Sequence, residues 1–298
     1  MPSDADFLGL TAGHGPGRYR FTVADHLSRL DGRLYGGTAI AVSVAVSELV
    51  SERRALWMTT QFVSTVDEGA EVDVLAEVLA GGSRTNQVRV TATSAGGEVI
   101  FASLGATGRP RPGGELDGVF EQCPEVAPPD EAHRWTSPFS GMAEAAGLPD
   151  IPLPGGPTGF ALAVEMREPE VIRHPEPGPG RTCLWVRRRD GQPITPAVAA
   201  YLADMVPMSL CRALGVIALG TSLDNTIRIG SFEPTEWILL DLRPHLALGG
   251  YGHGVAHVWS EGGHLLATAS QTASLRPVDP EALRAFFASI AAGEGQHH

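Results

Sequence analysis

The sequence predicts an α+β protein in which two tandem copies of an antiparallel sheet are each wrapped around a central helix. The first observation is a repeat. Turn motifs recur in the same order at nearly constant spacing: Ser94–Gly97 with Ser260–Gly263, 166 residues apart, and Arg109–Pro110 with Arg276–Pro277, 167 residues apart. Motif pairs at nearly one offset indicate an internal duplication. The second observation is an apolar helix-like run in each copy, which other elements must enclose.

The first copy is predicted to be one helix followed by four strands. A short strand at 17–27 precedes a helix at 36–50, which is apolar on nearly all sides and is therefore expected to be buried. Strands are expected at 56–66, 71–80, 83–95 and 98–108. In the third of these, apolar residues alternate with polar ones, which is the pattern of a half-buried strand.

The second copy repeats this plan with a longer helix. Thr195 is a predicted N-cap, and Pro196 suits the first helical position of a helix at 197–214. Pro207 leaves the carbonyl of Ala203 without its helical donor, so we expect a kink beside Asp204. A polar turn, Thr-Ser-Leu-Asp-Asn-Thr at 221–226, follows the helix. Predicted strands flank these elements, at 158–168 and 181–190 before the helix and at 225–232, 236–248, 252–261 and 264–276 after it.

We expect four segments along the chain. These are the N-terminal repeat at 1–110, a linker at 111–157, the C-terminal repeat at 158–277, and a C-terminal helix and tail at 278–298. The linker is rich in Pro, Gly and acidic residues. In the tail, Asp279 is the expected cap of an amphipathic helix, with Pro280 at its first position.

Composition excludes several classes of function. The chain has 298 residues, a formal net charge of −12 and 22 basic residues, all of them Arg. Without Lys, Schiff-base chemistry is excluded, and the negative charge argues against a nucleic-acid partner. Three separated Cys residues and no leader-like N-terminus favour a reducing, cytoplasmic location. No apolar run of about 18 residues is evident, so no membrane span is expected.

The ordered motifs resemble those of the double hotdog acyl-CoA thioesterase II family. In the first copy the resemblance rests on LYGGTAIAVSVAVSE, which looks like the family's F-G-G helix start, and on QFVSTVDEGAEVDVLAEVL. In the second copy it rests on YLADM, TSLDNTIRI, TEWILLDL and LLATASQTASLR. It covers roughly residues 17–110 and 158–277. The resemblance implies a double hotdog fold and hydrolysis of an acyl-CoA or carrier-bound acyl thioester, without a metal or other cofactor, in a homo-oligomer.

The resemblance also implies a set of site residues. In that family an acid, a hydroxyl residue and a Gln hold the hydrolytic water, and these positions fall on Asp204, Ser222 and Gln271. Ser222 departs from the usual Thr, and Asn225 stands where the family often has His. The remaining expected substrate-binding residues are Gly36, Gly37, Asp224 and Asn225, with the glycines letting substrate approach the backbone closely.

The duplication provides an independent test of this set. Subtracting 167 places Asp204, Ser222 and Gln271 on Gly37, Ala55 and Leu104. The first copy therefore does without all three polar groups, so the fold itself does not require them. The offset is uncertain by about one residue, and a slip of one residue in a strand reverses the side-chain face.

Other interpretations remain open from the sequence. A hotdog hydratase or dehydratase would pair a His with an acid, and no His lies near the three candidate stretches. A non-catalytic acyl-binding protein would keep the fold alone. His253 and His257 are expected on a solvated strand face, and the run Arg187–Asp190 on the surface, where it could also meet coenzyme A phosphates. The signatures of serine hydrolases, zinc proteases and P-loop NTPases do not occur.

Overall fold

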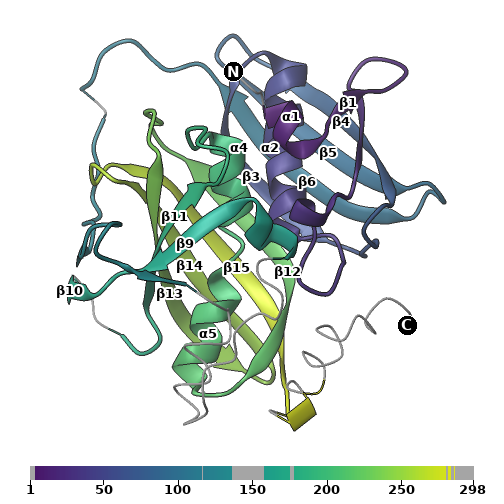
Figure 1. Ribbon diagram of the computed structural model, residues 1–298. Helices are drawn as coiled ribbons and strands as arrows, with labels where there is room; N and C mark the ends of the chain where they lie inside the picture. Colours follow the sequence, from purple (N-terminus) through teal and green to yellow (C-terminus); the bar gives the residue numbers. More distant parts are fainter. Residues whose placement is uncertain are drawn as a thin grey trace.

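The computed structural model confirms the predicted α+β architecture and joins the two copies into one antiparallel sheet (Figure 1). It describes residues 4–115, 117–135, 158–174, 178–279, 281–282 and 285. Thirteen strands follow the order β1-β2-β4-β5-β6-β3-β12-β15-β14-β13-β11-β9-β8. The purple-to-blue half and the teal-to-yellow half lie side by side, and each part of the sheet curves around helices of its own half.

The strands of the two halves follow the repeat predicted from the sequence. The first half contributes β1 (Thr11–Ala12), β2 (Arg18–Thr22), β3 (Arg54–Phe62), β4 (Glu71–Gly81), β5 (Thr85–Ser94) and β6 (Val99–Gly108). The second half contributes β7 (Glu125–Val126), β8 (His133–Arg134), β9 (Val164–Glu168), β10 (Val171–Arg173), β11 (Thr182–Arg188), β12 (Ala218–Ile229), β13 (Trp237–Leu248), β14 (Tyr251–Ser260) and β15 (Leu265–Pro277). A separate two-stranded sheet pairs β7 with β10.

The central helix of the first half is α2 (Gly36–Ser51), which is buried from Gly37 to Ser47. Burial on all sides is what the apolar sequence of this helix requires. Short helical segments accompany it: α1 (Asp4–Leu8), η1 (Asp25–Leu27) and, in the second half, η2 (Gly159–Leu162). One cluster of buried apolar side chains runs through both halves, so the two copies share a core.

The predicted long helix of the second half is interrupted. It forms α4 (Pro196–Leu202) and α5 (Val206–Leu214), with the break at residues 203–205 and Pro207 in the first turn of α5. Thr195 caps α4 as predicted, accepting a hydrogen bond from the backbone N–H of Val198 at 3.1 Å. Contrary to the sequence expectation, the stretch 196–214 is long and apolar enough to cross a membrane, but 78% of its most apolar window is buried inside the fold.

Strands β3 and β12 join the halves around a local two-fold relation. Thr59 faces Thr226, 167 residues later, and their hydroxyl oxygens are 2.9 Å apart. Each strand carries a β-bulge at an equivalent place, at Leu56 in β3 and Leu223 in β12. The internal offset inferred from the sequence is therefore present in the backbone of this junction.

Part of the predicted linker packs against the second half. Strand β8 pairs with β9, and the indole N–H of Trp185 donates to the carbonyl of Ala127 at 2.8 Å. This segment covers a second apolar cluster that includes Trp185, Trp237 and Trp259. His257 is consequently buried, with Glu121 3.5 Å away, and the expectation of a solvated His257 was wrong. His253 is exposed, as expected.

The C-terminal helix expected at 278–298 lies largely outside the described residues. Its proposed cap, Asp279, accepts a hydrogen bond from the backbone N–H of Glu281 at 3.0 Å.

The tight packing of α2 against α4 predicts that Gly37→Ala destabilises the protein. A Cβ at Gly37 would collide with the carbonyl oxygen of Tyr201 in α4. We expect a loss of about 1–3 kcal/mol in the free energy of unfolding, although Ala has the higher helix propensity. Denaturant unfolding measures this. Gly178→Ala is the matched control, because a Cβ there meets nothing within 4 Å. Equal stability of Gly37→Ala and wild type would contradict this packing.

Candidate active site

The structure brings Asp204, Ser222 and Gln271 together in the interior. Asp204 lies in the break between α4 and α5, and its residue is 7% exposed. Its Oδ1 accepts a hydrogen bond from Ser222 Oγ at 3.3 Å and another from Gln271 Nε2. Gln271 Nε2 also donates to Ser222 Oγ at 2.6 Å. A helix break and two neighbouring strands thus converge on one buried carboxylate.

The bulge at Leu223 is what places the polar groups of β12 on the inner face. The segment 221–226 is not the expected turn, because it lies within β12. Ser222 and Asn225 are three residues apart, so a regular strand would point them to opposite faces. The extra residue between Ser222 and Asp224 shifts the alternation, and both side chains face the interior. Asn225 lies directly opposite Gln271 of β15.

Asn225 and Asp224 contact the protein backbone near this site. Asn225 Nδ2 donates a long hydrogen bond, 3.5 Å, to the carbonyl of Ala203. That carbonyl is the one expected to lose its helical donor to Pro207, so Asn225 supports the break that carries Asp204. Asp224 accepts a hydrogen bond from the backbone N–H of Thr272 at 3.0 Å and thereby ties the bulge to β15.

The two glycines at the start of α2 face the other half of the molecule. A Cβ on Gly36 would collide with the Asp204 carboxylate, and one on Gly37 would collide with the backbone of Tyr201. Because neither residue has a side chain, α4 and Asp204 can lie directly against the N-terminus of α2. This end of a helix carries partial positive charge on its free N–H groups.

The environment of Asp204 favours its neutral form. Burial raises the pKa of this carboxyl to about 7, although the hydrogen bonds from Ser222, the backbone of Gly37 and Gln271 oppose the rise. A carboxylate with a pKa near neutrality can accept a proton and release it again at physiological pH. Such shifts are characteristic of functional sites.

The strand pairing and the helix ends change which residues of the first half correspond to Gln271 and Asp204, but these counterparts are still not acidic or amide residues. Ala273, the partner of Ser222, corresponds to Thr107, the partner of Ala55, so Gln271 corresponds to Gly105 and not to Leu104. Asp204 lies eleven residues before Gly215, the left-handed residue that ends α5. Eleven residues before Glu52, which ends α2 in the same conformation, is Ala41 and not Gly37. The counterparts in the first half remain apolar or small.

Sequence reasoning missed Tyr35, which immediately precedes Gly36. Its ring stacks on Phe160 with centroids 4.8 Å apart and meets the edge of Tyr201 at 5.1 Å. The signal that could have found it is its position next to the Gly-Gly pair. Because these glycines lie against Asp204, the preceding side chain is brought to the same interior.

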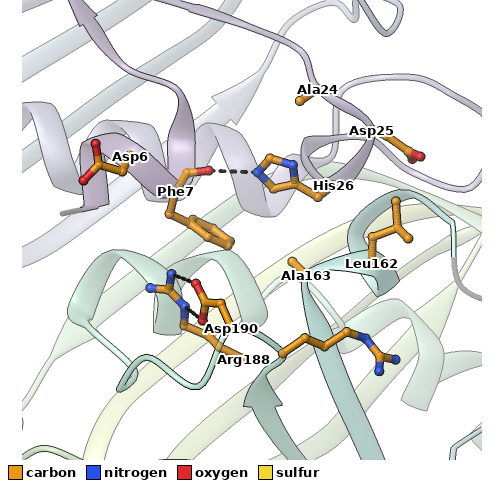
Figure 2. A pocket seen from close by; sticks show the side chains of 10 residues that line it. Asp6, Phe7, Ala24, Asp25, His26, Leu162, Ala163, Arg188 and Asp190 are labelled. Atoms are coloured by element: carbon orange, nitrogen blue, oxygen red, sulfur yellow. Dashed lines mark hydrogen bonds and ion pairs between the residues drawn. The ribbon is translucent and has the colours of Figure 1, made fainter. Parts of the chain in front are cut away.

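A cleft of about 630 Å³ opens beside Phe7 and His26 (Figure 2). It lies between the halves and is lined by Phe7 and His26 of the first half and by residues 188–190 of the second. Phe7 contacts the Tyr201 ring edge to face, and Tyr201 in turn contacts the ring of Tyr35. Arg188 is buried and paired with Asp190, contrary to the expected surface run, whereas Arg189 is exposed.

A group of possible metal ligands occurs away from Asp204. Ligand atoms of His174, Cys183 and Asp241 lie within 4.8 Å of one another. Both Asp241 oxygens accept hydrogen bonds from Arg181, and Arg243 donates to one of them. Burial also raises the pKa of the Cys183 thiol, which disfavours the thiolate that a metal needs. Two arginine charges and a neutral thiol fit an ion-pair cluster better than a cation site.

The raised pKa of Asp204 predicts a pH-dependent stability difference for Asp204→Asn. The folded protein binds more protons than the unfolded chain between about pH 4 and 7, so this carboxyl costs stability as pH rises through that window. We expect Asp204→Asn to be more stable than wild type by about 2–4 kcal/mol at pH 8, with the difference vanishing near pH 4.

Denaturant unfolding at several pH values measures this difference. The exposed Asp130 provides the control, because Asp130→Asn should change stability by less than about 0.5 kcal/mol at every pH. A difference between Asp204→Asn and wild type that does not grow with pH would contradict the burial of an ionisable carboxyl.

Two family models match most of the chain. The N-terminal domain of acyl-CoA thioesterases matches residues 24–108, and the C-terminal domain of acyl-CoA thioesterases matches residues 121–275. Among curated protein sequences, none matches this chain.

Solved structures are similar over nearly the whole chain. A putative thioesterase from Novosphingobium aromaticivorans is 30% identical, with 90% of this chain and 98% of that one covered and a TM-score of 0.76. Two more distant structures share the fold. A hot dog protein of unknown function from Alicyclobacillus acidocaldarius has 20% identity, 93% and 98% coverage and a TM-score of 0.74. An acyl-CoA thioesterase II from Mycobacterium marinum has 19% identity, 93% and 99% coverage and a TM-score of 0.69.

Both family models match in order, on a duplicated sheet that encloses its helices, and the same duplicated fold recurs in these structures. The chain therefore belongs to the acyl-CoA thioesterase family, and it is a thioester hydrolase with a double hotdog fold.

Proposed function

We propose that a water molecule held by Asp204, Ser222 and Gln271 hydrolyses an acyl-CoA thioester to the free acid and the thiol. The observation that carries the proposal is the convergence of Ser222 and Gln271 on the buried carboxylate of Asp204, whose pKa is raised to about 7. Gln271 Oε1 is buried and has no hydrogen-bond partner among the described residues, so it is available to accept a hydrogen bond from that water.

The proposed reaction begins with Asp204 in its ionised form. Its carboxylate accepts a proton from the water as the water oxygen attacks the thioester carbonyl carbon. The carbonyl oxygen becomes negatively charged, and the positive end of the α2 dipole, which begins at Gly36, stabilises this charge. The intermediate then collapses, the carbon–sulfur bond breaks, and the thiolate takes up the proton. Ser222 and Gln271 orient the water and keep the carboxylate in place.

The neighbours of Asp204 distinguish this proposal from other hotdog reactions. Within the described ranges, the groups hydrogen-bonded to Asp204 are Ser222, Gln271 and Gly37, and none is a histidine. A hydratase or dehydratase that pairs His with an acid therefore lacks support at this site. A carrier-bound acyl group presents the same thioester to Asp204 and remains an alternative to coenzyme A.

The cellular setting belongs to the same proposal. We propose a cytoplasmic enzyme of lipid or polyketide metabolism without a nucleic-acid or membrane partner. The separated cysteines support the location, and the acidic composition argues against nucleic acid. We also propose a homo-oligomer, as the family resemblance implies. Sedimentation of the purified chain tests the oligomeric state.

Removing the proposed base should abolish most of the activity. We expect Asp204→Asn to lower kcat for acyl-CoA hydrolysis by about 10²–10⁴-fold, because the amide cannot accept the proton. A thiol-release assay across several acyl chain lengths measures this. Asp130→Asn should retain wild-type rates. Wild-type turnover by Asp204→Asn would refute the assignment of the base, whereas binding without turnover by wild type would favour an acyl-binding protein.

The pH profile should report the same carboxyl. Because Asp204 acts only when ionised, kcat/KM should fall about tenfold for each pH unit below an apparent pKa of about 7. The loss of thioester absorbance is the suitable readout, since thiol reagents themselves respond to pH. A profile that stays flat down to about pH 5 would place the pKa of the base in the ordinary carboxylate range and contradict the proposed environment.

A further inference from the structure

The hydroxyl of Tyr35 is a buried polar group that the proposed reaction does not use. Tyr35 is 5% exposed, and its hydroxyl oxygen has no hydrogen-bond partner in the described part of the chain. A buried hydroxyl without a partner costs free energy, whereas a phenyl ring of the same shape would not. The ring is already held by stacking on Phe160, so packing does not explain the oxygen.

Tyr201 provides a direct comparison. It is also fully buried and touches Tyr35, but its hydroxyl donates to the carbonyl of His26 at 2.5 Å and lies 3.4 Å from the carbonyl of Phe160. The fold thus satisfies one of two adjacent tyrosine hydroxyls and leaves the other available. The Tyr35 hydroxyl is therefore available to a group from outside the described residues.

Tyr35 lies close to the proposed reaction centre. Tyr35 immediately precedes Gly36 and Gly37, the helix start that meets the Asp204 carboxylate. A Cβ at Gly37 would also collide with the Tyr35 ring, so this ring lies against the same helix start. Burial and then the charge of Asp204 raise the pKa of Tyr35. The neutral phenol therefore persists at physiological pH and can donate a hydrogen bond.

A second unpartnered atom lies in the same interior. Asn225 is fully buried, and its Oδ1 has no partner within the described ranges. Both oxygen atoms are available, and both residues flank Asp204, Tyr35 through its neighbour Gly36 and Asn225 through the carbonyl of Ala203.

We propose that the Tyr35 hydroxyl determines specificity by hydrogen bonding to an oxygen substituent on the acyl chain of the substrate, close to the thioester. The enzyme would then prefer acyl thioesters with a hydroxyl or keto oxygen over unsubstituted chains of equal length. The inference rests on the proposed function. The thioester carbonyl already has the helix start of α2, and the water has Asp204, Ser222 and Gln271, so the acyl chain is the remaining candidate.

The test compares matched substrates in Tyr35→Phe. Wild type should hydrolyse 3-hydroxybutanoyl-CoA with a higher kcat/KM than butanoyl-CoA. Tyr35→Phe should lower kcat/KM for the hydroxylated substrate by about 10–100-fold and leave that for butanoyl-CoA unchanged or raised. An equal loss on both substrates would mean that the hydroxyl acts on the thioester itself. No change on either would mean that it holds only a water. Either result would overturn the proposal.

Tyr201→Phe is the matched control for the ring and its surroundings. Because the Tyr201 hydroxyl is bonded to the protein, its removal should lower the melting temperature and affect both substrates equally. Tyr35→Phe should keep or raise the melting temperature, since no protein hydrogen bond is lost. Greater destabilisation by Tyr35→Phe than by Tyr201→Phe would show that its hydroxyl serves the fold.

A binding experiment separates this proposal from the assignment of the base. In an Asp204→Asn background, titration calorimetry compares butanoyl-CoA with 3-hydroxybutanoyl-CoA, with and without Tyr35→Phe. We expect Tyr35→Phe to weaken binding of the hydroxylated ligand alone by about 10-fold or more. Retained selectivity in the double variant would refute the role of Tyr35 even if Asp204 proves to be the base. Loss of selectivity would support that role even if the water is held differently.

Discussion

The close approach of α2 to α4 is the constraint on which the rest of the structure depends. Gly37 has no side chain because the carbonyl of Tyr201 occupies its space, and Gly36 has none because the Asp204 carboxylate does. This contact buries the N-terminus of one helix against the break in another, and the shared core closes around it. The same contact desolvates Asp204 and presents it to the positive end of α2. The contact between α2 and α4 therefore determines both the packing of the two halves and the raised pKa of Asp204.

Sequence patterns predicted the helices and the main strands of each repeat, because periodicity and turn motifs are local, whereas the set Asp204, Ser222 and Gln271 came from the family resemblance. They failed where tertiary contacts decide. The segment 221–226 is polar like a turn, but pairing with β3 and β15 makes it strand. His257 alternates like a solvated residue, but residues from the predicted linker cover it. The position of Tyr35 beside the Gly-Gly pair could have drawn notice to the residue, but only three-dimensional packing shows that its hydroxyl is unpaired among the described residues.

The two halves share a fold, including the bulge in β3 and β12, but have different interiors. Where the second half has Ser222, Asn225 and Gln271, the first has Ala55, Met58 and Gly105. A Cβ at Gly105 would approach the sulfur of Met58 to 2.8 Å, so that methionine takes up the room of a side chain there. The equivalent region of the first half is closed by apolar packing. One half thus supplies the polar side chains around Asp204, and the other supplies the start of α2 and Tyr35.

The matching bulges at Leu56 and Leu223 have a consequence for the history of this chain. A bulge is useful to the second half because it turns Ser222 and Asn225 inward together, yet the first half keeps the same distortion around Ala55 and Met58. A feature retained where no polar group needs it indicates that the distortion was present in the single ancestral unit before duplication. Chemistry could then diverge by side-chain replacement alone, on a backbone inherited by both descendants.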